Sequence, residues 1–215
     1  MHIPILLDNL FKPLPNIPEK SLLTIAIRHF QFESIHPFED GNGRTGRLLI
    51  LAYLLQYEYL TAPILNISQF FEKNRDEYVY SLRSVTDAKS YQQWLLFFLR
   101  GVEEQSKEVV RLINELRSIK KTDEDKVSSE FRNTAVPLFL LDFALQKFFF
   151  TITNFEEYLK RKRVPLKAAY QTARNNILRF EKMGLLAKNH KRDQADTYVH
   201  VGLKNVLMVK KTTPT

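Results

Sequence analysis

Apolar residues recur at helical spacing along most of the first half of this chain. One stripe lies between residues 21 and 35 and another between residues 44 and 57, which predicts two amphipathic helices. Pro18 suits the first turn of the earlier helix. A longer helical pattern passes through Val102 and ends near Leu116. The first half is therefore predicted to be a bundle of helices.

The second half has a different order of elements. Helical patterns are followed by two short runs of strand-forming residues around a basic loop, with a turn at Val164-Pro165 and a helix stop at Gly184. Three helices and then a hairpin are typical of a winged helix-turn-helix. The predicted helices cover residues 137–149, 153–160 and 167–180, and the predicted strands cover 185–188 and 197–201.

A charged segment that is poor in apolar residues separates the two halves, at about residues 118–130. Such a composition favours a linker. The chain is therefore predicted to hold a helical domain over residues 1–118, a linker over 119–130 and a small α+β domain over 131–215.

Candidate chemistry gathers between the first two predicted helices, in residues 36–47, which we call the motif segment. A histidine can take up a proton near neutral pH, and a carboxylate can hold Mg²⁺. Glycines at a helix N-terminus let phosphate oxygens approach backbone N–H groups, and arginines bind phosphates. The residues concerned are His36, Asp40, Gly41, Asn42, Gly43, Arg44 and Arg47. They are the groups needed for phosphoryl or nucleotidyl transfer.

Each of these residues alone has a plain structural interpretation, as a helix end, a turn or a solvated face. Other known classes of binding site match the motif segment less well. An EF-hand would need ligands where Arg44 and Leu51 stand, and a P-loop would need Lys followed by Ser or Thr. Zinc would need a second His or Cys at ligand spacing.

The motif segment resembles the signature of the Fic family, His-x-Phe-x-(Asp/Glu)-Gly-Asn-Gly-Arg-x-x-Arg, with no departure. Residues 3–11, 74–82 and 91–99 look like further helices of the family core, so the resemblance covers about residues 1–105. The fold class it implies is mainly α, a Fic helical core followed by a small α+β winged-helix domain. The chain begins after the point where a β-hairpin flap and often an inhibitory helix occur in the family, so we expect an N-terminally incomplete Fic core.

The resemblance implies a protein adenylyltransferase that uses ATP and Mg²⁺. His36 would take the proton from a Ser, Thr or Tyr hydroxyl of a target protein, and Asp40 would hold the metal. Asn42 and the backbone at Gly43 would form the anion hole for the α-phosphate, and Gly41 would also bind the nucleotide. Arg44 would hold the β-phosphate and Arg47 would reach the γ-phosphate. Tyr78 would lie beside the nucleotide, and Phe38 would anchor the loop in the core.

Two alternatives stay open beside AMP transfer. The same groups could transfer another nucleotide or remove AMP from a modified protein. In a different class, the chain could be a DNA-binding regulator with a vestigial or sensing Fic core.

The composition limits the chemistry and the cellular location that we expect for the protein. It has 215 residues, of which 44% are hydrophobic, and no cysteine, which excludes disulfides and a cysteine nucleophile. No apolar run approaches 18 residues and no signal peptide is visible, so we expect a cytoplasmic protein with no membrane partner.

The positive charge is concentrated near the C-terminal end. Residues 151–215 hold 14 Lys and Arg against 5 Asp and Glu, whereas the net charge of the whole chain is +8. The basic side chains that could contact nucleic acid are Arg174, Arg179, Lys191 and Arg192. Winged helices also serve as protein-binding or dimerising scaffolds, so contact with nucleic acid and a homodimer both stay open.

Overall fold

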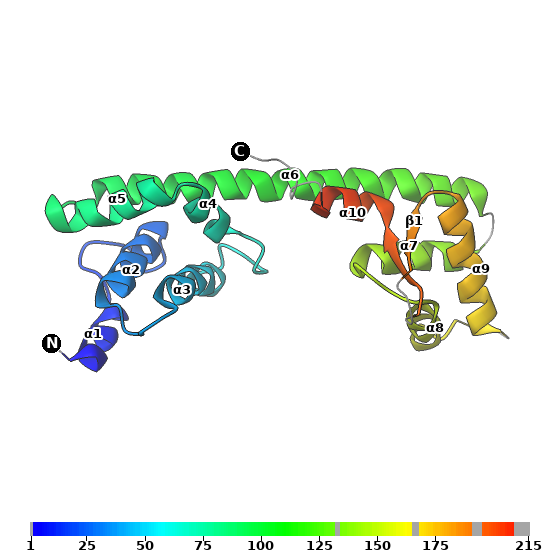
Figure 1. Ribbon diagram of the computed structural model, residues 1–215, viewed down its shortest axis with the longest axis horizontal. Helices are drawn as coiled ribbons and strands as arrows, with labels where there is room; N and C mark the ends of the chain where they lie inside the picture. Colours follow the sequence, from blue (N-terminus) through cyan, green and yellow to red (C-terminus); the bar gives the residue numbers. More distant parts are fainter. Residues whose placement is uncertain (1, 132–133, 165–167, 191–194, 209–215) are drawn as a thin grey trace. The chain divides into compact units, whose positions relative to one another are not determined.

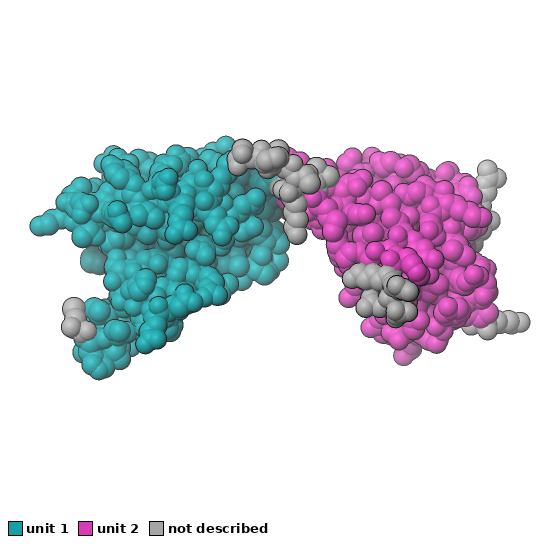
Figure 2. Space-filling model, in the orientation of Figure 1, with its two compact units in different colours: residues 1–110 teal, residues 111–215 magenta. Residues whose placement is uncertain are grey.

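The computed structural model describes residues 2–131, 134–164, 168–190 and 195–208. The chain divides into two compact units, residues 1–110 and 111–215, which are coloured separately in Figure 2. Figure 1 shows the ribbon coloured along the chain, with the helices and β1 labelled. The predicted fold class is confirmed, because helices dominate and one small two-stranded sheet lies near the C-terminal end.

Unit 1 is built only of helices among its described residues. They are α1 (Ile3–Leu10), α2 (Leu22–Ile35), α3 (Asn42–Gln56), α4 (Ile67–Lys73), α5 (Arg75–Asp87) and the first part of α6 (Gln92–Glu130). α2 begins later than Pro18 suggested. The Ser21 side chain accepts a hydrogen bond from the Thr24 N–H at 3.1 Å, which caps the helix and places Pro18 in the preceding turn.

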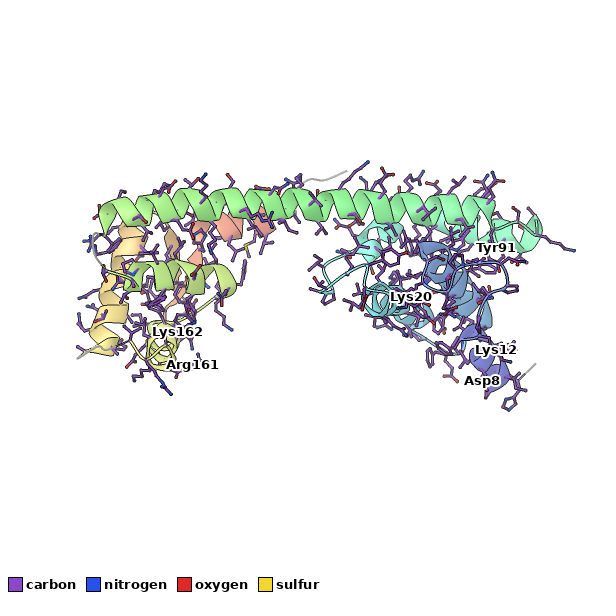
Figure 3. The ribbon with its side chains drawn as sticks, turned by 180° about the vertical axis from the view of Figure 1, so that it is seen from behind. Asp8, Lys12, Lys20, Tyr91, Arg161 and Lys162 are labelled. Carbon is purple, nitrogen blue, oxygen red and sulfur yellow. The ribbon has the colours of Figure 1, made fainter. Side chains whose placement is uncertain are left out.

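An aromatic cluster forms the core of unit 1. Trp94 of α6 is fully buried, and its indole N–H donates to the carbonyl of Ala26 in α2 at 2.8 Å. Phe71 and Phe97 pack on the same indole. Tyr91, labelled in Figure 3, stands just before α6 and meets the ring of Phe30 edge-on at 5.4 Å. These contacts hold α2 in place against α4 and α6.

Unit 2 follows the order that the sequence predicted, with small shifts of the ends. It contains the last part of α6 and then α7 (Val136–Gln146), α8 (Ile152–Arg161), α9 (Ala169–Lys182), β1 (Leu186–Asn189), β2 (Thr197–His200) and α10 (Val201–Met208). The strands are antiparallel, with Leu186 opposite His200 and Asn189 opposite Thr197. α10 was not predicted from the sequence. Assignment of this unit as a winged helix-turn-helix stays a prediction.

The expected linker over residues 119–130 is wrong. These residues form the end of α6, and the boundary between the units lies at residues 110–111, inside that helix. Val127 is 1% exposed in the core of unit 2. Oδ2 of Asp123 lies 3.1 Å from Nε2 of His200, at the end of β2. The charged composition suggested a linker, but a helix that buries one narrow face can carry charged residues on all its other faces.

Among the described residues, no helix combines the length and the apolar character that crossing a bilayer requires.

Two valines of α6 test whether its last part is structural. Val127→Ala should lower the free energy of unfolding of unit 2 by about 2 kcal/mol, because two buried methyl groups are lost and a cavity is left. Val110→Ala is the matched control, since Val110 is 56% exposed on the same helix and should cost less than about 0.5 kcal/mol. Urea unfolding measures both. If both substitutions left the free energy of unfolding unchanged, the linker interpretation would be restored.

Candidate active site at the junction of α2 and α3

His36 ends α2 in a left-handed backbone conformation, with φ of 50°. This conformation turns the chain sharply into the motif segment. The side chain is exposed, and its Nδ1 lies 3.4 Å from the carbonyl oxygen of Glu33. Nε2 has no protein partner among the described residues. The imidazole can therefore accept a proton from a group that approaches from solvent.

Asn42 fixes the shape of the motif segment. Its side chain is 3% exposed and bonds twice to the backbone of Phe38: Oδ1 accepts from the N–H at 2.9 Å, and Nδ2 donates to the carbonyl at 2.6 Å. Both polar atoms of the side chain thus bond within the segment. The backbone N–H of Asn42 lies in the first turn of α3, has no partner within the helix and can bind a phosphate.

The first turn of α3 offers a site for an anion. Gly41 is the N-cap, with φ of 88°, and it supplies no side-chain cap. The N–H of Thr45 makes the first helical bond, to the carbonyl of Gly41 at 2.9 Å. The preceding N–H groups, on residues 42 to 44, have no partner within the helix and lie at the positive end of its dipole.

The two arginines of the motif segment are held differently. Arg44 is exposed and forms an ion pair with Asp40, from Nη2 to Oδ2 at 2.9 Å, while Asp40 Oδ1 accepts from the Gly41 N–H at 2.6 Å. Arg47 is half-buried and lies back along α3, so that a Cβ on Gly43 would stand 3.2 Å from its Nη1. Gly43 therefore gives this guanidinium room beside the first turn of α3.

A cleft of about 560 Å³ borders both arginines. Its remaining lining is mostly apolar and comes from α3 and from the segment that leads into α4: Leu48, Leu51, Pro63, Ile64, Leu65, Asn66, Ile67 and Ser68. The cleft combines two cations with an apolar wall. It can receive an anion that carries a flat or apolar group.

Polar side chains also lie beneath the motif segment, which the sequence analysis missed. His29 is buried, and burial lowers its pKa to about 4, so it is neutral at pH 7. Its Nε2 bonds the hydroxyl of Tyr78 at 2.9 Å and lies 4.0 Å from Oε1 of Glu33. The spacing of His29 and Glu33, one helical turn apart and just before His36, was the signal available in the sequence.

The hydroxyl of Tyr78 bonds His29, and its ring stacks on that of Phe71 with the centroids 4.7 Å apart. The place of Tyr78 beside a nucleotide stays a prediction. The expected role of Phe38 is corrected. Phe38 is 49% exposed and touches the core through Phe32 alone among the ring contacts of the described residues. Asn42, and not Phe38, anchors the loop.

In unit 2, the structure describes two of the four expected nucleic-acid contacts, Arg174 and Arg179. Arg179 pairs with Glu130 at 2.9 Å and lies over the ring of Phe131 at 3.9 Å. Arg174 is exposed on α9. Lys191 and Arg192 lie outside the described residues.

Comparison with known proteins points to one family. Residues 1–54 match the Fic/DOC family. A probable protein adenylyltransferase of Aquifex aeolicus (strain VF5) is 39% identical over 61 residues, which cover 28% of this chain and 17% of that protein. The crystal structure of a Fic family protein from Desulfovibrio desulfuricans G20 aligns with a TM-score of 0.48 and 22% identity, over 93% of this chain and 55% of that one. The chain thus matches only part of the length of each relative.

The clamp made by Asn42 can be measured through stability. Asn42→Ala should lower the free energy of unfolding of unit 1 by about 1–3 kcal/mol, because two backbone groups of Phe38 lose their partner. Glu39→Ala, in the same loop and exposed, should change it by less than about 0.5 kcal/mol. Chemical denaturation followed by tryptophan fluorescence reports on unit 1, since Trp94 lies in its core. An Asn42→Ala protein as stable as the control would show that the clamp contributes nothing.

Proposed function

Because the N-terminal part of this chain belongs to the Fic/DOC family, we propose that the protein transfers AMP from ATP to a hydroxyl side chain of a target protein. One observation carries this proposal. The junction of α2 and α3 brings an exposed imidazole, three partnerless helix N–H groups and two arginines into one short segment. These groups match the needs of a reaction that deprotonates a hydroxyl and stabilises a polyphosphate.

The steps follow from the positions of the groups. Nε2 of His36 takes the proton from a Ser, Thr or Tyr hydroxyl of the target. The freed oxygen forms a bond to the α-phosphorus, and the bond from that phosphorus to the bridging oxygen of the β-phosphate breaks. Pyrophosphate leaves with the electron pair, and AMP stays on the target. Positioning and charge stabilisation supply most of the rate.

The phosphates find their partners along α3. The backbone N–H groups of Asn42 and Gly43 bind the α-phosphate, and the nearby Gly41 keeps the approach open. Arg44 binds the β-phosphate and Arg47 the γ-phosphate. The apolar wall of the cleft beyond these arginines covers the less polar part of the substrate.

Asp40 is the residue that would hold Mg²⁺. Its carboxylate is 92% exposed at the mouth of the segment, and one carboxylate together with phosphate oxygens suits this ion. When bound, Mg²⁺ neutralises phosphate charge. Asp40 and Arg44 pair with each other in this structure, and an exposed pair of this kind contributes only about 0–1 kcal/mol. Asp40 and Arg44 can therefore exchange each other for Mg²⁺ and phosphate at little cost in free energy.

For unit 2 we propose a winged helix-turn-helix that serves as a scaffold. The ion pair of Arg179 with Glu130 and its place over Phe131 engage it within the unit, which favours a role other than base contact. Contact with nucleic acid through Arg174 and a homodimer stay predictions. Transfer of a different nucleotide, or removal of AMP, would use the same groups of unit 1.

Labelled ATP tests the proposed reaction. With Mg²⁺ and a cell lysate, ATP labelled at the α-phosphate should leave its label on protein, and ATP labelled at the γ-phosphate should not. His36→Ala and His36→Asn should reduce the transfer at least about 100-fold, because the base is lost, with ATP affinity nearly unchanged. The Asn variant tolerates the left-handed backbone and so keeps the loop.

The matched control is His190→Ala, which removes an exposed histidine of unit 2 and should leave transfer unchanged. A loss of only a few-fold in both His36 variants would contradict the role of His36. Label retained from both positions of ATP would contradict AMP transfer itself.

A further inference from the structure

A buried histidine at the end of β2 caps the start of α10. His200 is 0% exposed, and its Nδ1 accepts a hydrogen bond from the N–H of Leu203 at 3.2 Å. Leu203 lies in the first turn of α10, where backbone N–H groups have no partner within the helix. A ring nitrogen that accepts a hydrogen bond carries no proton, so the imidazole is neutral and its proton lies on Nε2.

A carboxylate of α6 lies on the other side of the same ring. Oδ2 of Asp123 is 3.1 Å from Nε2 of His200, and the Asp123 side chain is 8% exposed. The two atoms are close but are not aligned for a hydrogen bond, so the interaction between them is electrostatic. The ring thus stands between an N–H of α10 and a charge of α6, which are both labelled in Figure 1.

α10 packs closely on α6 at this point. A Cβ on Gly202, in the first turn of α10, would stand 2.6 Å from Cγ2 of Ile119 in α6 and 3.2 Å from Cε1 of His200. Leu203 and Val206 of α10 are buried. The imidazole therefore lies where the start of α10 meets α6, and a change in its charge acts on the contact between the two helices.

A cavity of about 290 Å³ opens beside the ring. Among the described residues that line it, the charged side chains besides His200 are Asp123 and Lys126, both from α6. Nζ of Lys126 lies 3.7 Å from Oδ1 of Asp123. The lining residues from α10 are uncharged, and β1 places Leu186 opposite His200. The charges that face the imidazole therefore come from α6.

Burial lowers the pKa of His200 below its ordinary value of 6.5, and the Asp123 carboxylate opposes this effect. Protonation would place a donor on Nδ1 opposite the Leu203 N–H and a positive charge at the N-terminus of a helix. A histidine with a lowered pKa takes up its proton more readily once its surroundings open. The contact of α10 with α6 is therefore fully stabilised above about pH 6.5 and is weakened as the pH falls below that value.

We propose that His200 is a proton-sensitive latch: its neutral imidazole holds α10 on α6, and its protonation releases α10. Release takes Leu203 and Val206 out of the core of unit 2 and uncovers α6 around Ile119. The latch lies within unit 2 and does not depend on the function proposed for unit 1.

Hydrogen exchange on the full chain measures the opening of α10. The protection factors of its amides, each relative to an unfolded peptide at the same pH, should fall about fivefold between pH 7.5 and pH 5.5. The fall should not exceed about tenfold, because one histidine that ionises in the open form gives tenfold per pH unit below 6.5. The amides of Ile177 and Phe180 in α9 should stay equally protected, which separates local opening from unfolding of the unit.

One substitution removes the titration and keeps the cap. His200→Asn has no ionisable ring, but its side-chain oxygen can accept from the first turn of α10. Its α10 amides should have the same protection factors at both pH values. His190→Asn is the matched control, since it replaces the other histidine of unit 2, whose side chain is 73% exposed, and it should retain the wild-type fall.

NMR of the ring needs no substitution at His200. At pH 7.5 the nitrogen shifts should show an unprotonated Nδ1 and a protonated Nε2, and the titration of the ring should give a pKa below 6.5. In Asp123→Asn this pKa should fall further, because the carboxylate that favours the imidazolium is lost.

The outcomes that contradict the latch are distinct. Wild-type α10 protection factors that do not change with pH, or that change equally in His200→Asn, would overturn it. A proton on Nδ1 at pH 7.5, or a His200 pKa at or above 6.5, would also overturn it. If His200→Asn does not fold, wild-type exchange and the titration of the ring decide the question. None of these results alters the transfer reaction proposed for unit 1.

Discussion

The close approach of α2 and α3 is the constraint on which the candidate site depends. Gly46 lies at this approach, where an added Cβ would stand 3.0 Å from Cε1 of His29 and would require Oε1 of Glu33 to move. Two buried hydrogen bonds also hold α2 in place. His29 bonds Tyr78, and Trp94 bonds the backbone of α2. The end of one helix, with its imidazole, and the start of the other, with its N–H groups, are thereby fixed to each other by packed side chains and not by a flexible loop.

The groups at the surface of this junction are held more loosely than those beneath it. Asn42 is buried and bonded twice, whereas Asp40 and Arg44 pair with each other in contact with water. A fixed loop backbone, with charged side chains above it that can change partners, suits a site that must admit a polyphosphate and a protein segment in turn. The free energy that shapes the segment comes from groups that need not touch the substrate.

Much of this could be predicted from the sequence, and the exceptions have physical causes. The stripes of α2 and α3 and the hairpin of β1 and β2 were readable because each buries one face of a regular element. The bond between His29 and Tyr78 could not be predicted, because the two residues lie 49 positions apart and only the fold brings them together. The end of α6 was misjudged because one buried residue such as Val127 is hidden among charges.

The central claim is that the first turn of α3 binds the phosphates of ATP while Arg44 and Asp40 exchange each other for new partners. A crystal structure with Mg²⁺ and a non-hydrolysable ATP analogue tests it most directly. The account predicts the α-phosphate at the N–H groups of Asn42 and Gly43, with Arg44 on the phosphates and Asp40 beside the metal. A nucleotide bound away from α3, or an Asp40–Arg44 pair that persists with nucleotide in place, would contradict it.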